Sequence, residues 1–282
     1  MTVVCCGIGA DTTNVSLRDS RVPIVDEAGR FEYVPIPEKT RETREELTFG
    51  TIPQRTGDGT MADLLASLTP DPDGTGESIT DPAAIAAYPP HHDPNFDALT
   101  YGEHRPGYVN RLAALEGNGD DAVAFYAGLE DDEGRLHRYL VGWFPVAKKT
   151  VVEADDDPDT KREKLASHPD NAHTKRAVDG LPYRDDRRVV LLDGDSEADD
   201  LGGGLLDRAG PKMSTFAAFG GERRGYFLDD EFVREFEVSK PDHDPDSSLR
   251  ADKAGVTRKP AIVCDLTARE FRDRLSSHQH SS

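Results

Sequence analysis

A segment of seventeen residues, HHDPNFDALTYGEHRPG (91–107), contains three histidines, two aspartates, a glutamate and an arginine. Imidazole titrates near neutral pH, and a nearby carboxylate can orient it or exchange a proton with it. These residue types suit acid–base chemistry or the binding of a phosphate or a base. We therefore predict that His92 and Asp93 are catalytic, together with the distant His173.

The same side chains could hold a metal ion, but their spacing argues against it. His91 and His92 are adjacent, and adjacent side chains of an extended segment point to opposite sides, so the two do not chelate together easily. The chain contains neither H-x-E…C-x-x-C nor H-E-x-x-H. We predict no metal site and leave the cofactor open; for any single histidine, the alternative is a structural role at a turn.

A second polar segment, SHPDNAH (167–173), adds His168 and Asn171 to His173. The amide of Asn171 offers a donor and an acceptor that suit the edge of a base, and we predict that it contacts a nucleotide. The alternative is an Asx turn after proline, which the same residue favours equally.

Acidic residues dominate the whole chain, with 54 Asp and Glu against 34 Lys and Arg and a formal net charge of −20. This pattern predicts an acidic surface and is typical of halophilic proteins, because the Debye length falls to about 3 Å at 1 M salt and screens the repulsion. A local basic surface could still bind nucleic acid, so net charge does not decide the partner.

No stretch approaches the roughly eighteen apolar residues of a membrane helix, and the N-terminus lacks the pattern of a signal peptide. We predict a cytoplasmic protein with no membrane partner. Cys5, Cys6 and Cys264 are odd in number and have no zinc-site spacing, so they predict no disulfide framework.

Hydrophobic periodicity alternates between strand and helix along the chain. Strands are expected at 2–11, within a hairpin at 22–37, in a central antiparallel meander at 121–153, at 187–195, and at the start of 259–277. Helices are expected at 60–71, 107–115, 159–173, after the turn in 201–210, at 226–238, and at the end of 259–277.

These elements predict a single α+β domain over residues 1–282, with a curved, mainly antiparallel sheet flanked by helices, and a barrel-like core as one form of that sheet. Surface loops are expected at 71–83 and 241–255, and a disordered tail at 278–282. We expect the functional face to gather the loops at 9–21, 91–104 and 168–176.

Several blocks, in the same order, resemble the nucleotide modification associated domain family, type three. They are GADTTNVSLRDSRVPIVDEAGRFEYVPIPE, HHDPNFDALTYG, GDDAVAFYAGL…YLVGWFPV and NAHTKR…VVLLDGD, within about residues 7–195. The resemblance implies an association with making or handling modified DNA bases, without a defined reaction. It falls on Asp11, Pro23, Asp26, Gly29, Pro35, Pro37, His92, Asp93, Pro94, Gly128, Gly142 and His173.

The strand pair around Gly142 also resembles that of small barrels that recognise modified bases. There a glycine lets a strand curve around an apolar pocket, and Tyr126 or Trp143 at its mouth could stack on a flipped base. The alternative for both aromatic side chains is packing in the core.

Three functions remain open. The first is a nucleotide- or nucleic-acid-handling protein of DNA base modification, with His92, Asp93 and His173 at the ligand and Arg18, Arg21 and Arg176 at phosphate; Asp11, Tyr126 and Asn171 complete the predicted nucleotide site. The second is an enzyme that uses the same histidines and aspartate for acid–base chemistry on a nucleotide or sugar. The third is a non-catalytic interaction subunit, which we expect if the histidine loops lie far apart.

Overall fold

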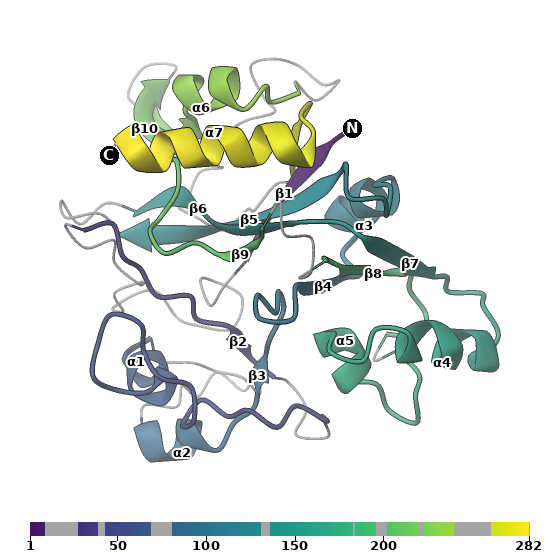
Figure 1. Cartoon of the computed structure of the whole chain (residues 1–282). Helices are drawn as coiled ribbons and strands as arrows, with labels where there is room; N and C mark the ends of the chain where they lie inside the picture. Colours follow the sequence, from purple (N-terminus) through teal and green to yellow (C-terminus); the bar gives the residue numbers. More distant parts are fainter. Residues whose placement is uncertain are drawn as a thin grey trace.

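The computed structural model describes most of the chain and has a mixed α+β architecture (Figure 1). The described residues are 1–8, 28–38, 43–68, 81–130, 136–182, 184–195, 202–219, 223–239 and 261–281. The predicted loop at 9–21, nearly all of the loop at 71–83 and the loop at 241–255 lie outside them, as do Asp11, Arg18, Arg21, Pro23 and Asp26.

The central sheet has five strands. Their order is β12 (Ile262–Cys264), β1 (Val3–Gly7), β5 (Ala122–Glu130), β6 (Leu136–Pro145) and β9 (Gly204–Leu205). Only the β1–β5 pair is parallel; the other pairs are antiparallel. The α+β prediction is therefore confirmed, but among the described strands no sheet closes into a barrel, because β12 and β9 remain edges.

The central sheet separates two hydrophobic cores, because successive side chains of a strand point to opposite faces. In β5, Val123 and Phe125 pack into one core, whereas Ala124 and Tyr126 pack into the other. The residues of β1 divide in the same way. A β-strand buried on both faces explains why the sequence of β5 is almost continuously apolar.

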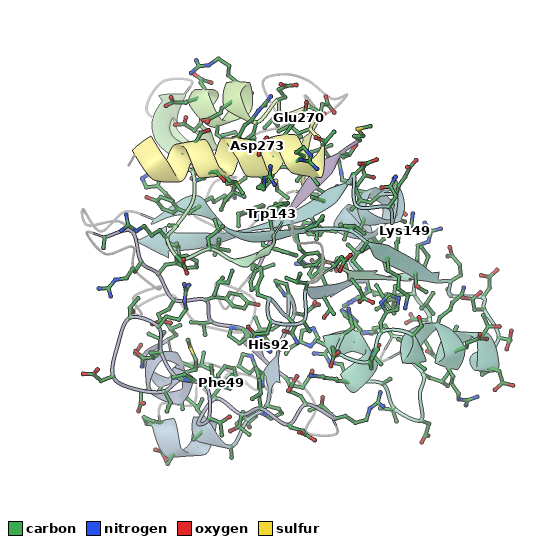
Figure 2. All side chains as sticks on the ribbon, viewed as in Figure 1. Phe49, His92, Trp143, Lys149, Glu270 and Asp273 are labelled. Carbon is green, nitrogen blue, oxygen red and sulfur yellow. The ribbon has the colours of Figure 1, made fainter. Side chains whose placement is uncertain are left out.

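One face of the central sheet is covered by α6 (Asp230–Glu235), α7 (Ala268–Ser281) and the hairpin of β10 (Ser214–Phe219) and β11 (Arg223–Leu228) (Figure 1). Trp143 of β6 lies between the sheet and α7, with its ring 5.9 Å from that of Phe271 (Figure 2). The helix predicted at 226–238 is limited to α6, and residues 278–281 continue α7 where we expected a disordered tail.

On the other face lies a three-stranded sheet of β4 (Thr100–Glu103), β8 (Val189–Asp193) and β7 (Lys148–Val152). The meander predicted over 121–153 is correct for β5 and β6 but wrong for β7, which pairs with β8 instead. The backbone leaves the central sheet after Pro145, and the amide of Ala147 donates to the carbonyl of Asp193. The pairing of β7 with β8 joins residues that are far apart in sequence, so local periodicity does not predict it.

The remaining helices are short. α1 (Met61–Ser67) begins with a capping box of Thr60 and Asp63. It packs with α2 (Pro82–Ala86) in a third core beneath β2 (Ile36–Pro37) and β3 (Pro90–His91). α3 (Pro106–Ala113) agrees with the predicted helix at 107–115. The helix expected at 159–173 is divided into α4 (Pro158–Ala166) and α5 (Ala172–Lys175), and 201–210 forms β9 without a helix.

No helix in the described part of the chain is both long enough and apolar enough to cross a membrane.

We predict that Gly142→Ala destabilises the fold by about 1–3 kcal/mol. Gly142 lies where the β5–β6 register shifts, and an added Cβ would be 2.3 Å from Phe96 Cε1 and 2.9 Å from the carbonyl oxygen of Gly204. Urea denaturation measures the free energy of unfolding. The matched control is Gly107→Ala in α3, where an added Cβ meets nothing within 4 Å; an equal loss in both variants would contradict the packing explanation.

Candidate functional site

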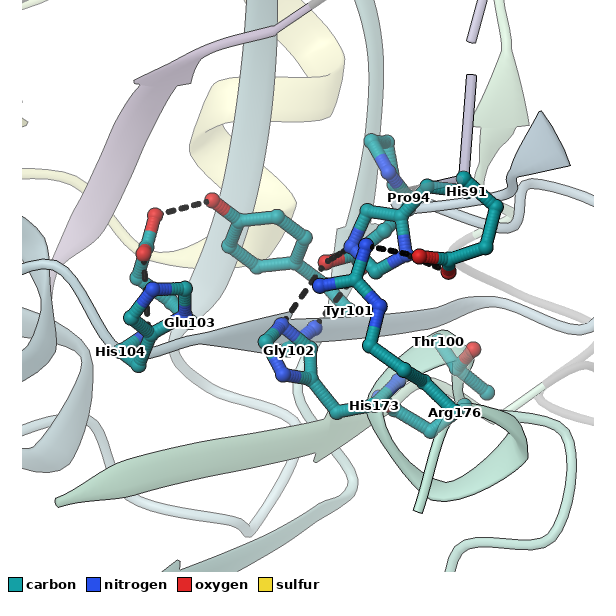
Figure 3. Close-up of polar contacts among 12 residues, drawn as sticks. His91, Pro94, Thr100, Tyr101, Gly102, Glu103, His104, His173 and Arg176 are labelled. Atoms are coloured by element: carbon teal, nitrogen blue, oxygen red, sulfur yellow. Dashed lines mark hydrogen bonds and ion pairs between the residues drawn. The ribbon is translucent and has the colours of Figure 1, made fainter. Parts of the chain in front are cut away.

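Three side chains from two distant segments meet beside β4. The Nε2 atoms of His91 and His173 lie 3.6 Å and 3.4 Å from the same oxygen, Oδ2 of Asp93. The two imidazole rings pack edge to face with centroids 5.4 Å apart (Figure 3). The loops at 91–104 and 168–176, which we expected to form one functional face, therefore come together.

Gly102 in β4 makes this meeting sterically feasible. Its amide donates a 2.9 Å hydrogen bond to Oδ1 of Asp93, which fixes that carboxylate and leaves Oδ2 toward the histidines. A Cβ at this position would lie 2.2 Å from Cδ2 of His173, so only glycine lets the imidazole approach the strand.

The alternation of β4 divides its residues between the site and the core. Tyr101 and Glu103 face the core, where the Tyr101 hydroxyl donates to Glu103 at 2.9 Å and its ring packs on Phe125. Glu103 also binds Arg105 at the start of α3. Thr100 and Gly102 face α5 instead, as the contact of Thr100 with the carbonyl of Asp170 shows.

Glu38 forms the second layer of the site. The β2–β3 pairing places it beside His91, whose Nδ1 lies 3.1 Å from Glu38 Oε2, and Arg176 pairs with the other carboxylate oxygen at 2.5 Å. Burial alone would raise the pKa of Glu38, but the hydrogen bond from His91 and the Arg176 guanidinium lower it to about 2. Glu38 is therefore an anion that accepts from both neighbours.

The turn before α5 orients His173. Asn171 caps this helix, and its Oδ1 accepts the backbone N–H of His173 at 3.0 Å. Asn171 is fully buried, and within the described residues its Nδ2 has no hydrogen-bond partner. The Asx turn that we considered as the alternative is thus present.

The imidazoles of His91 and His104 favour the neutral form. Burial, followed by the charge of Arg176, lowers the pKa of His91 in spite of the adjacent carboxylates. Burial and the neighbouring His173 lower the pKa of His104 to about 4; the rings of these two histidines are 5.5 Å apart. Neutral imidazoles keep a nitrogen lone pair available for a proton or a metal ion.

The histidine that joins Asp93 and His173 in this cluster is His91, whereas we predicted His92. Asp93 and His173 meet as expected. The charged groups that act on His92 are Glu45, Asp97, Lys175 and Asp93. A usable signal was present: His91 and Asp93 are two residues apart, and such residues share a face of an extended segment. Glu38 and Gly102 carried no comparable signal, because their roles arise from long-range pairing.

The predicted nucleotide-binding residues have varied positions. Tyr126 is only 1% exposed and packs in the core between the sheet and α7, so it does not lie at a pocket mouth. Arg176 is buried and pairs with Glu38. Asn171 is the cap of α5. Asp11, Arg18 and Arg21 lie outside the described residues.

A small cavity of about 180 Å³ lies along the loop that follows Asp93. It is lined by Phe96, Asp97, Leu99, Asp195, Gly202 and Gly203. Small-molecule sites usually have about 300–1,000 Å³. None of the clustered histidines lines this cavity, so it does not define the site.

The fold and the site define a mixed α+β protein with a buried histidine–carboxylate cluster. The family model of nucleotide modification associated domain 3 matches residues 2–262, and the chain therefore belongs to this family. This confirms the resemblance on which the sequence analysis relied. Comparison with curated proteins and with solved structures finds no match. Family membership associates the chain with nucleotide modification and specifies no reaction.

We predict that Glu38→Gln lowers the free energy of unfolding by about 3–5 kcal/mol, because it removes the carboxylate charge that faces the buried Arg176 guanidinium. Glu153→Gln is the matched control, since it removes the same type of pair, with Arg188, at a partly exposed position. We expect the control to lose less than about 1 kcal/mol. Urea denaturation at neutral pH compares the two, and equal losses would contradict the importance of burial.

Proposed function

We propose that this chain is an enzyme of nucleotide modification, whose reaction centre consists of His91, Asp93 and His173. The observation that carries the proposal is the convergence of two imidazole nitrogens on one carboxylate oxygen, at 3.6 Å and 3.4 Å. Groups held at such distances can exchange a proton or act together on one bound atom. Membership of a family associated with nucleotide modification supports a nucleotide as the substrate class to test.

The energetic cost of burying the Glu38–Arg176 ion pair beside the cluster supports a chemical role. Glu38 and Arg176 are 2% and 5% exposed in their side chains, and buried ion pairs usually contribute little net stability compared with apolar packing. A network that orients His91 through Glu38 is typical of a site in which ring orientation matters. This favours an enzyme over the non-catalytic interaction subunit that we also considered.

The surroundings favour a nucleotide over a long nucleic acid as the first substrate to test. Arg176 and Lys175, the cations closest to the centre in sequence, both pair with carboxylates, those of Glu38 and Glu45. Binding to DNA gains strength from lysine and arginine side chains that face phosphates. Arg18 and Arg21 remain our predicted phosphate contacts.

We expect the full chain to alter a free nucleotide, detected by liquid chromatography and mass spectrometry after incubation with nucleoside mono- and triphosphates. Plain and base-modified DNA form parallel arms. Asp93→Asn and His173→Gln should each slow the reaction by at least about 100-fold, the usual contribution of a positioned acid–base group. Glu153→Gln, at a distant surface pair, serves as the control.

Conversion at the wild-type rate by Asp93→Asn would contradict the proposal. So would the absence of both conversion and calorimetric binding in every nucleotide and DNA arm. If DNA alone were converted, the proposed reaction centre would stand, and DNA would replace the free nucleotide as the proposed substrate.

We further expect Arg18→Ala and Arg21→Ala to raise KM for the phosphorylated substrate by about tenfold or more, since a hydrogen bond to a charged group contributes roughly 1.5–3 kcal/mol. The matching nucleoside, which lacks the phosphate, should be bound equally well by the variants and the wild type. Equal effects on nucleotide and nucleoside would exclude the phosphate contact.

A further inference from the structure

The hydrogen bonds around the reaction centre determine where its lone pairs point. Glu38 is held as an anion by Arg176 and can only accept, so Nδ1 of His91 carries the proton that joins them. The opposite nitrogen, Nε2, then presents its lone pair to Oδ2 of Asp93 at 3.6 Å. Two acceptors facing each other across a buried gap repel unless a positive group lies between them.

Asp93 has one oxygen left for such a group. Its Oδ1 accepts the amide of Gly102, whereas Oδ2 faces Nε2 of His91 and Nε2 of His173. A single shared proton would join only two of these three atoms, Oδ2 and the two Nε2 nitrogens. A metal ion could bind all three as ligands at once.

The spacing of the donor atoms agrees with metal coordination. Ligand atoms at about 2.1 Å from a tetrahedral ion are about 3.4 Å from one another. The measured separations are 3.4 Å and 3.6 Å, and one ligand atom from each residue lies within 4.8 Å of the other two. The two histidine–aspartate separations therefore already match those of a tetrahedral site, and the third separation is at most 4.8 Å.

We propose that His91, Asp93 and His173 bind one divalent transition-metal ion, with Glu38 as the carboxylate that orients the His91 ring. Two imidazoles favour Zn²⁺ or Fe²⁺, whereas Mg²⁺ and Ca²⁺ prefer oxygen ligands. Three protein ligands leave at least one coordination position open, as in catalytic metal sites. The use of that position in nucleotide chemistry rests on the proposed function, but metal binding is testable alone.

The proposal revises our sequence-based prediction of no metal site for a specific reason. That prediction considered His91 and His92 as a chelating pair, and these residues do not share the site. The donor set instead combines His91 with Asp93, its neighbour on the same face, and with His173 from α5. The spacing that argued against a metal therefore does not apply to these three residues.

The test is metal binding by the full chain carrying His278→Ala and His280→Ala, which removes imidazoles of the C-terminal segment from the measurement. After chelation, the chain is titrated with Zn²⁺ by calorimetry and with Co²⁺ by visible absorption, and metal content as purified is measured by mass spectrometry. We expect about one ion per chain and tetrahedral or five-coordinate Co²⁺ bands.

Two variants in this background test the histidine ligands, and a third tests the carboxylate that orients His91. His91→Ala and His173→Ala should weaken binding by at least about 100-fold, and Glu38→Gln by about 10–100-fold. His92→Ala, the adjacent histidine outside the cluster, should keep the parent affinity. Circular dichroism of the metal-free proteins identifies any variant that fails to fold, and for such a site His91→Gln or His173→Gln replaces the alanine.

The absence of metal binding in the parent chain would overturn the proposal, as would an equal loss in His92→Ala and His91→Ala. Failure of the proposed function has a different signature. If one ion binds through His91 and His173 but no nucleotide is bound or altered, the metal site stands and the nucleotide role falls. If nucleotides are altered by the chelated protein at the full rate, the proposed function stands and the metal ion has no part in the reaction; metal binding is then judged by the titrations alone.

Discussion

The hydrogen bond from the Gly102 amide to Asp93 is the constraint on which the candidate site depends. It joins the loop after β3 to β4 and directs the free oxygen of the carboxylate toward two imidazoles. The same glycine leaves room for His173, which a Cβ would displace. Gly102 thus sets both the orientation of the Asp93 carboxylate and the approach of His173. Glu38, held by its ion pair with Arg176, then orients His91.

Local patterns in the sequence predicted most elements and part of the site. The apolar run of β1, the capping box before α1 and the aromatic strands β5 and β6 are encoded by neighbouring residues, and all of them form. Asp93 and His173 were identified by their residue types. His91 was set aside because only its immediate neighbour was considered, although the residue two positions on was the informative one.

Long-range pairing decided what local patterns could not. β7 has the composition of a third meander strand, yet it joins β8. Glu38 directly follows the segment predicted as a hairpin, and the β2–β3 pair places it against His91. Two aspartates before α4 also have structural roles: Asp157 caps α4, and Asp156 pairs with Lys164. Such roles depend on residues distant in sequence or on helix ends.

The central sheet works as a partition between two separately packed layers. The family match ends at residue 262, whereas α7 begins at Ala268 and packs on the face of the sheet that does not bear the histidine cluster. Because the sheet lies between the two cores, a substitution that loosens the packing of α7 is expected to disturb the histidine cluster only through the strands themselves.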